Sequence, residues 1–158
     1  MTEHHASIPQ APAVVRLFGP VGSLLLRLGV PMGPDRLVTI RGRKSGLPRT
    51  VALAVTELGS RRFVIGTYGE VQWTRNLRAA GEAVIGVGRH AEHVRAVELD
   101  PEQAATILRE LAGYIDRLPW ILRGVTLFML RFGDAREVVD APTSAARTRP
   151  VFELQRLP

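Results

Sequence analysis

Apolar residues in the first part of the chain recur every three or four positions, which is the spacing of one helix face. Between Val14 and Leu28 this pattern predicts a helix, and we expect Gly19-Pro20 to kink or break it. Residues 1–13, rich in proline and alanine, are predicted to form a flexible N-terminal arm.

The uncharged run Leu17–Leu26 is about half of the ~20 residues that a bilayer-spanning helix needs, so the predicted helix does not span a membrane. Two other environments suit it. We expect it to pack on a sheet. The alternative is peripheral membrane contact through residues 14–28, with Arg16 and Arg27 near the lipid headgroups.

Short β-rich runs separated by glycine turns follow, and this pattern is typical of an antiparallel meander rather than of βαβ units. A second strand pair is expected around Arg89-His90, and the alternation near the C-terminus predicts a closing strand. The predicted strands are Arg36–Arg41, Thr50–Glu57, Arg61–Thr67, Glu82–Gly88, Ala91–Leu99 and Val151–Leu157.

Helix start and stop signals place two further helices. Val71–Ala80 is followed by Gly81, a residue suited to the left-handed end of a helix, and Asp100-Pro101 is a strong N-terminal signal for Glu102–Arg117. The apolar segment Trp120–Phe132 is predicted to be a core or lid helix, with a second membrane-facing surface as the alternative.

The last forty residues give weaker signals. Arg136–Asp140 is predicted as a short strand and Ala141–Arg149 as a loop. The whole pattern predicts an α+β domain over residues 14–158, with a mostly antiparallel barrel of about six strands and three or four packing helices. No internal repeat or domain boundary is visible.

Composition narrows the chemistry. The chain has no cysteine, which excludes disulfides, thiolate catalysis and cysteine-ligated metals and suits a cytoplasmic protein. The first residues lack the basic and apolar regions of a secretory signal. His90 and His93 point to opposite faces of an extended strand, so we expect no metal site.

Positive charge is concentrated in one window. The net charge is +6, and five of the basic residues lie between Asp35 and Glu57 with no acidic residue among them: Arg36, Arg41, Arg43, Lys44 and Arg49. Such a local surplus favours a discrete anionic ligand. Nucleic-acid binding is the weaker interpretation, because the two Trp, two Tyr and five Phe do not interleave with this window as stacking platforms.

The centre of this window is Gly42-Arg43-Lys44-Ser45-Gly46, two glycines around two cations and a hydroxyl, and Lys44 is the only lysine in the chain. Such a turn can offer an anion its backbone N–H groups and its cationic side chains.

Two ordered motifs make the sequence resemble the deazaflavin (F420)-dependent nitroreductase family of split β-barrel reductases. The first is Leu37-Val38-Thr39 leading into Gly42–Gly46 and Pro48-Arg49. The second is the Trp73…Asn76-Leu77 pattern, and Thr148–Val151 resembles the family's C-terminal strand.

The resemblance implies a split β-barrel that binds coenzyme F420, with FMN as the alternative cofactor. The phosphate and oligoglutamate tail would meet Arg43, Lys44, Ser45, Gly46 and Arg49. The flat ring would lie against Gly66, Thr67, Tyr68, Trp73 and Asn76, with Tyr68 as candidate proton donor. Other interpretations make Trp73 a core anchor, let Asn76 tie the preceding loop to its helix, and pair Arg49 with Glu57 or Glu70.

The implied activity is hydride transfer from reduced deazaflavin to a small electron-poor acceptor such as a quinone, enone or nitro compound. The chain has Ala52-Leu53 where many relatives have Pro-Leu, and Ala141–Arg147 lacks the tyrosines of nitro-reducing relatives. The alternatives are a non-catalytic protein that carries deazaflavin or lipid, and an FMN-using relative. Monomer and dimer both stay open.

Overall fold

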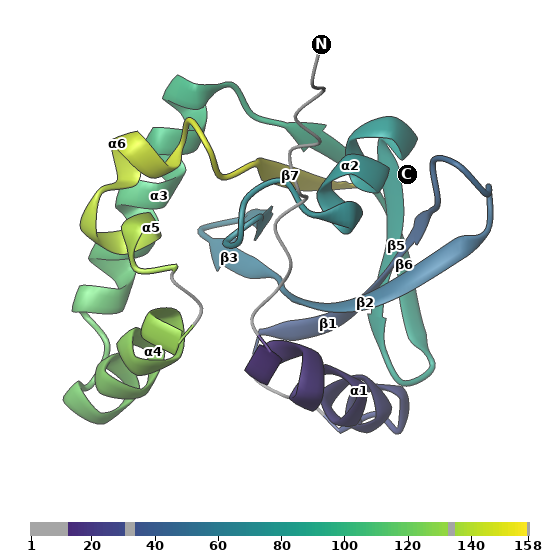
Figure 1. Ribbon diagram of the computed structural model, residues 1–158, viewed down its shortest axis with the longest axis horizontal. Helices are drawn as coiled ribbons and strands as arrows, with labels where there is room; N and C mark the ends of the chain where they lie inside the picture. The colour runs from purple at the N-terminus through teal and green to yellow at the C-terminus, as the bar shows by residue number, and fades with distance from the viewer. Residues whose placement is uncertain (1–12, 31–33, 133–134, 158) are drawn as a thin grey trace, which may run out of the picture.

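The structure is a computed structural model that describes residues 13–30, 34–132 and 135–157 (Figure 1). Its centre is one antiparallel sheet with the strand order β2-β1-β5-β6-β7-β4-β3. The strands are β1 (Asp35–Arg41), β2 (Pro48–Ala54), β3 (Thr56–Leu58), β4 (Arg61–Ile65), β5 (Glu82–Val87), β6 (His90–Glu98) and β7 (Val151–Arg156). The prediction of an α+β fold around a mostly antiparallel barrel is confirmed.

The sheet curls because its two outermost strands are consecutive in the chain. The predicted strand Thr50–Glu57 is split into β2 and β3, which lie at opposite ends of the strand order and are joined through Val55 alone. Val55 is buried, and its N–H donates to the Pro34 carbonyl at 3.0 Å. The simple meander prediction is therefore wrong, since a local pattern cannot show that the chain changes edges at one buried residue.

The inside of the curl holds the larger core. Inward residues of β1, β5, β6 and β7 pack with Leu77 and Trp73 of α2 (Gln72–Ala80). The helix ends as predicted, at Gly81 with φ 67°. The core includes Val38, Ile40, Ile85, Val94, Phe152 and Leu154. Helix α2 therefore lies on the concave side of the sheet (Figure 1).

A second layer packs on the outer side of β4 and β7. It contains α3 (Pro101–Asp116), α5 (Glu137–Asp140) and α6 (Pro142–Ala145), with Phe63 and Val151 facing Leu108 and Val138. Helix α3 begins at the predicted cap, where Asp100 Oδ1 accepts the N–H groups of Glu102 and Gln103 at 3.0 and 2.9 Å.

The prediction of a strand at Arg136–Asp140 is wrong, because Glu137–Asp140 form α5 and Arg136 precedes it. The predicted loop Ala141–Arg149 contains α6. The β-branched pair Val138-Val139 favours a strand locally. Burial of Val138 against α3 outweighs that preference.

Helices α1 (Ala13–Arg27) and α4 (Trp120–Phe132) lie together on one side of the molecule (Figure 1). Of the kink or break predicted at Gly19-Pro20, the break is absent, since α1 runs through Pro20 and buries Leu26 completely. Its packing on β1 and β2 compensates the N–H that proline lacks. The predicted arm lies outside the described residues apart from Ala13, which begins α1.

Helix α4 has the predicted bounds, but the core alternative of the core-or-lid prediction is wrong, because Trp120, Ile121 and Val125 are 83%, 57% and 52% exposed. The lid alternative stays a prediction. Within the described ranges, no helix is long and apolar enough to cross a bilayer.

Candidate functional site

The basic turn, residues 42–46, connects β1 to β2 and is closed by its own backbone. The Gly42 N–H donates to the Leu47 carbonyl at 2.8 Å, and the Gly46 N–H donates to the Gly42 carbonyl at 2.8 Å. Gly46 has φ 68°, and a Cβ on Gly42 would lie 3.1 Å from the Leu47 carbonyl oxygen, which accepts the Gly42 N–H. Both glycines are therefore required by the shape of the turn.

Arg43 is held by helix α2. Its Nη1 donates to Asn76 Oδ1 and to Gln72 Oε1, both at 2.9 Å, and its backbone N–H donates to Asn76 Oδ1 at 3.3 Å. Because both donors come from Arg43, the acceptor on Asn76 is its carbonyl oxygen. Asn76 thus joins the two predicted motifs, and the interpretation that it ties the preceding loop to its own helix is wrong.

These bonds leave the charge of Arg43 uncompensated, because both partners are neutral amides. In the part of the chain that the structure describes, Arg41, Lys44 and Arg49 also make no ion pair. Glu70 pairs instead with Arg75 and Arg78, so the alternative pairing of Arg49 with Glu57 or Glu70 is not found among the described residues.

Lys44, Ser45 and Arg49 are exposed. The Ser45 Oγ accepts the Leu47 N–H at 3.3 Å, which leaves its own hydrogen available to a ligand. Four cations without a carboxylate partner at one hairpin bend give a local positive potential that suits an anion.

The residues after β4 form a second tight segment. The Gly66 N–H donates to the Pro150 carbonyl at 2.7 Å, and a Cβ on Gly66 would lie 3.0 to 3.1 Å from Pro150, Gly69 and Thr74. Arg149 Nη1 donates to the Thr67 carbonyl at 2.7 Å, and its Nη2 lies 3.4 Å from Glu137 Oε2. Arg149 therefore fixes this segment from the neighbouring layer.

Tyr68 lies in this segment and is half-buried. Burial raises the pKa of its hydroxyl, so the group is protonated at neutral pH. Trp73, three residues before Asn76, tilts at 54° against Phe152 with ring centroids 6.2 Å apart. Its core-anchor role is thus seen directly.

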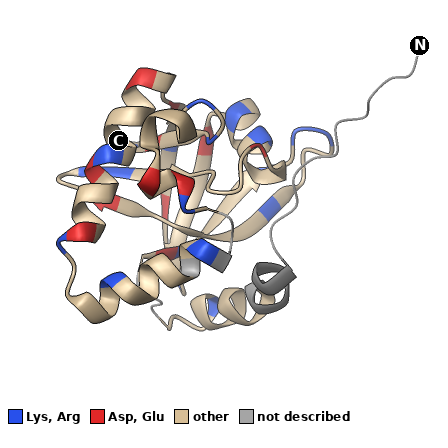
Figure 2. Cartoon of the chain, turned by 60° about the vertical axis from the view of Figure 1, so that its left-hand side comes forward, with Lys and Arg blue, Asp and Glu red and all other residues tan. Residues whose placement is uncertain are grey.

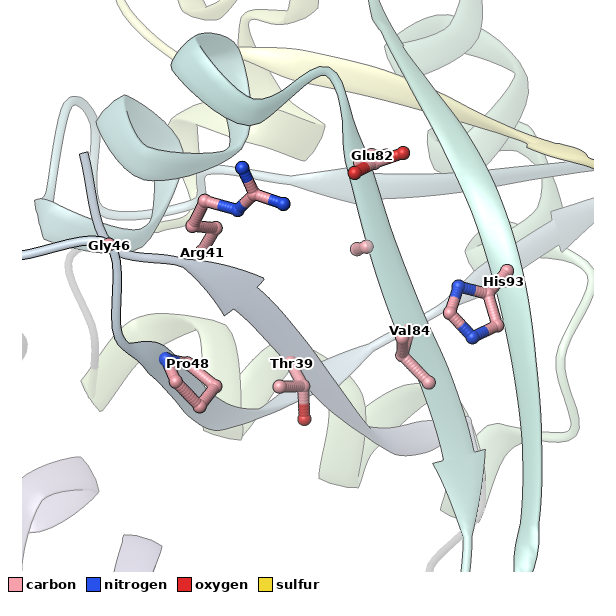
Figure 3. Close-up of a pocket in the computed structure, with 8 residues that line it drawn as sticks. Thr39, Arg41, Gly46, Pro48, Glu82, Val84 and His93 are labelled. Atoms are coloured by element: carbon pink, nitrogen blue, oxygen red, sulfur yellow. The ribbon is translucent and has the colours of Figure 1, made fainter.

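A hollow of about 260 Å³ lies beside the basic turn on the outer face of β1, β5 and β6 (Figure 3). Thr39, Val84 and His93 are cross-strand neighbours there. Arg41 and Glu82 stand at one end of it, where β1 finishes and β5 begins. The lining residues are Thr39, Arg41, Gly46, Pro48, Glu82, Ala83, Val84 and His93.

The structure brings the sequence-predicted site residues together only in part. Arg43 meets Asn76, but Gly46 is the one predicted residue that lines the hollow, and the segment Gly66–Tyr68 does not. Sequence reasoning missed Gln72, Arg149 and the hollow. Gln72 precedes Asn76 by four positions and so shares its helix face, a signal that could have found it.

No cluster of three or more possible metal-ligating side chains occurs among the described residues.

The part of the chain that contains the basic turn and Asn76 also matches a known family. The model of a family described as F420H(2)-dependent quinone reductase matches residues 13–131. No curated protein matches the chain.

Several solved structures are similar. A putative 5-nitroimidazole antibiotic resistance protein from Bacteroides thetaiotaomicron has a TM-score of 0.53 at 10% identity, covering 84% of this chain and 78% of its own. A protein described as a domain-swapped dimer has a TM-score of 0.50 at 20% identity, covering 86% and 95%. The F420-H2 dependent reductase FDR-A has a TM-score of 0.48 at 21% identity, covering 77% and 94%.

Proposed function

Because the chain belongs to the F420H(2)-dependent quinone reductase family, it is an oxidoreductase with coenzyme F420 as its cofactor, and we propose that it reduces a quinone by hydride transfer. Enones and nitro compounds are the other acceptors to be compared. One observation carries the proposal: the basic turn holds uncompensated cations and is joined to the second motif through Asn76.

The chemistry of the turn fits the anionic part of the cofactor. We propose that the phosphate and tail bind Arg43, Lys44, Ser45, Gly46 and Arg49. Arg43 is already oriented by Asn76 and Gln72, so little side-chain entropy is lost when it meets an anion. The remaining N–H groups of its guanidinium can contact phosphate oxygens.

We place the flat ring near Gly66, Thr67, Tyr68, Trp73 and Asn76. Supporting this placement, helix α2 carries Trp73 and Asn76 next to the Arg43 contact, and Arg149 fixes the carbonyl of Thr67. An apolar wall with a few fixed polar groups is what a flat aromatic ligand requires. Asn76 would then bridge the two halves of the cofactor site.

When bound, the reduced cofactor supplies the hydride. The chain's own task is to hold the acceptor against it, to exclude water and to provide a proton. Tyr68 is the candidate proton donor, since its hydroxyl is protonated at neutral pH and lies in the segment proposed to face the ring. Positioning supplies most of the acceleration in this scheme.

We further propose a cytoplasmic protein that touches the inner face of the membrane through residues 14–28. The support is a row of exposed apolar side chains, Val21 and Leu24 on α1 and Leu28 directly after it. This location would suit an apolar quinone, which dissolves in lipid.

The test is a titration of the full chain with F420 and with FMN, followed by ligand fluorescence. We expect saturable micromolar binding of F420 and a large loss of affinity in the double variant R43A/K44A. The matched control is R109A/R147A, which removes two cations that make no ion pair within the described residues but lie on α3 and just after α6. Equal losses in both variants, or FMN preference, would overturn the assignment.

Turnover separates a reductase from a carrier. We expect the F420-loaded enzyme to reduce a quinone faster than an enone or a nitro compound, and Y68F to lower kcat with little change in F420 affinity. Tight F420 binding without turnover of any acceptor would establish the carrier alternative.

A further inference from the structure

Helix α4 turns an apolar stripe toward solvent. Ile121, Val125 and Phe128 follow the spacing of one helix face and are 57%, 52% and 56% exposed. Thr126, Leu127 and Leu130 lie around the opposite side and are partly buried. Surface helices normally place such a stripe against the core, so this arrangement is the reverse of the usual one.

One flank of this stripe carries a cation and a tryptophan. Arg131 is exposed beside the stripe, and α4 contains no carboxylate (Figure 2). Arg123 lies on the other side of the helix, one turn before Thr126 and Leu127, and its Nη2 lies 3.1 Å from Asp116 Oδ1. Trp120 begins the helix and is 83% exposed. An apolar face with an arginine at its edge and a terminal tryptophan is the composition of a helix that lies in a lipid headgroup region.

Helix α1 repeats the arrangement. Leu26 is completely buried, while Val21 and Leu24 on the opposite side of α1 are 56% and 57% exposed, and Leu28, directly after the helix, is 70% exposed. Arg27 is exposed beside them. The two helices lie on the same side of the molecule in both views, although about a hundred residues separate them in the chain (Figures 1 and 2).

We infer that α4 is a second docking helix and that α1 and α4 together bind the surface of an anionic lipid bilayer. This inference extends the membrane contact proposed for α1 and is independent of cofactor binding. We choose lipid rather than a second copy of the chain because an exposed arginine lies beside each stripe, Arg131 on α4 and Arg27 on α1. Two copies meeting at this face would bring like charges together, whereas anionic headgroups complement them.

The test is co-sedimentation of the full chain with vesicles of phosphatidylcholine containing about one third phosphatidylglycerol, and with pure phosphatidylcholine. We expect binding to the anionic vesicles and about a tenfold loss of partition coefficient for I121Q/V125Q on α4. L24Q/L28Q, at the end of α1 and directly after it, should give a similar loss. The matched control is V97Q/Y114Q, which changes two exposed apolar residues on β6 and α3 and should bind like the wild type.

Fluorescence gives a second readout. On binding, the emission of Trp120 should shift to the blue, and this shift should be missing in W120F. F420 affinity, measured in the same preparations, should be unchanged in all four variants, so a failed cofactor assignment would not be confused with a failed docking surface.

Two results would overturn the inference. One is vesicle binding that the α4 variant leaves unchanged. The other is a wild-type dimer that I121Q/V125Q converts to a monomer without any vesicle binding, which would assign the face to a second copy of the chain.

Discussion

Asn76→Asp is the sharpest change that the proposed cofactor site allows. The aspartate keeps the shape of the side chain, and its carboxylate oxygen can accept the same two bonds from Arg43. Its charge now neutralises the guanidinium, which the amide left uncompensated. We therefore expect the fold to persist while F420 affinity falls.

The magnitude follows from two contributions. A charge-assisted contact between Arg43 and a phosphate is worth about 1.5–3 kcal/mol, which the new ion pair removes. Repulsion between the carboxylate and a phosphate about 8 Å away adds about 1 kcal/mol at an effective dielectric constant of about 40. The sum of about 2.5–4 kcal/mol raises the Kd by about two to three orders of magnitude.

The assay is the fluorescence titration with F420 at low and high salt, with Tm measured in parallel. T106E is the matched control, because it adds the same charge at an exposed position of α3, in the other layer. The loss in N76D should shrink at high salt as screening grows. A Kd within threefold of the wild type, with unchanged Tm, would refute the placement of the anion at the basic turn.

Three further predictions concern the fold that positions the site. Bonds from Arg62 and Arg156 lower the pKa of Glu92 to about 2, so its stabilisation is present above the ordinary carboxyl pKa and is lost as pH falls. E92Q should therefore have a lower Tm than the wild type at pH 7, with the gap closing between pH 4.5 and 2; a gap independent of pH would contradict this. G42A should cost about 1–3 kcal/mol in urea unfolding, because its Cβ would lie 3.1 Å from the backbone carbonyl oxygen of Leu47, which the turn holds in place; G22A, with open space around it, is the control. F152A should cost about 3–5 kcal/mol, since the ring is completely buried against Trp73, and a loss below 1 kcal/mol would show that this core is loosely packed.

Much of the fold could be predicted from interactions between residues that are close in the sequence. Asp100-Pro101 and Gly81 place helix ends through bonds between near neighbours in the chain, and both predictions are confirmed. The basic turn was recognisable for the same reason. The change of sheet edge at Val55 could not be predicted from the sequence. It depends on the pairing of β7 with β4 and β6, and the spacing of residues along the chain carries no information on that pairing.

The burial of apolar helix faces was the other feature that the sequence did not predict. The pattern of Trp120–Phe132 predicted a helix with apolar stripes correctly, but periodicity does not say whether a stripe meets protein or another surface. For the site, both motifs were found in the sequence, while the bond between Arg43 and Asn76 required the tertiary structure. Gln72 and Arg149 were missed because their partners lie in distant segments.

The single buried residue between β2 and β3 sets the distance between two hairpins. The hairpin that ends in the basic turn and the hairpin that leads into Gly66–Tyr68 are both attached to the peptide at Val55. The separation between the two halves of the proposed cofactor site is therefore fixed by how many residues stand there. A relative with one residue inserted at this point would present the same side chains to a ligand of different reach.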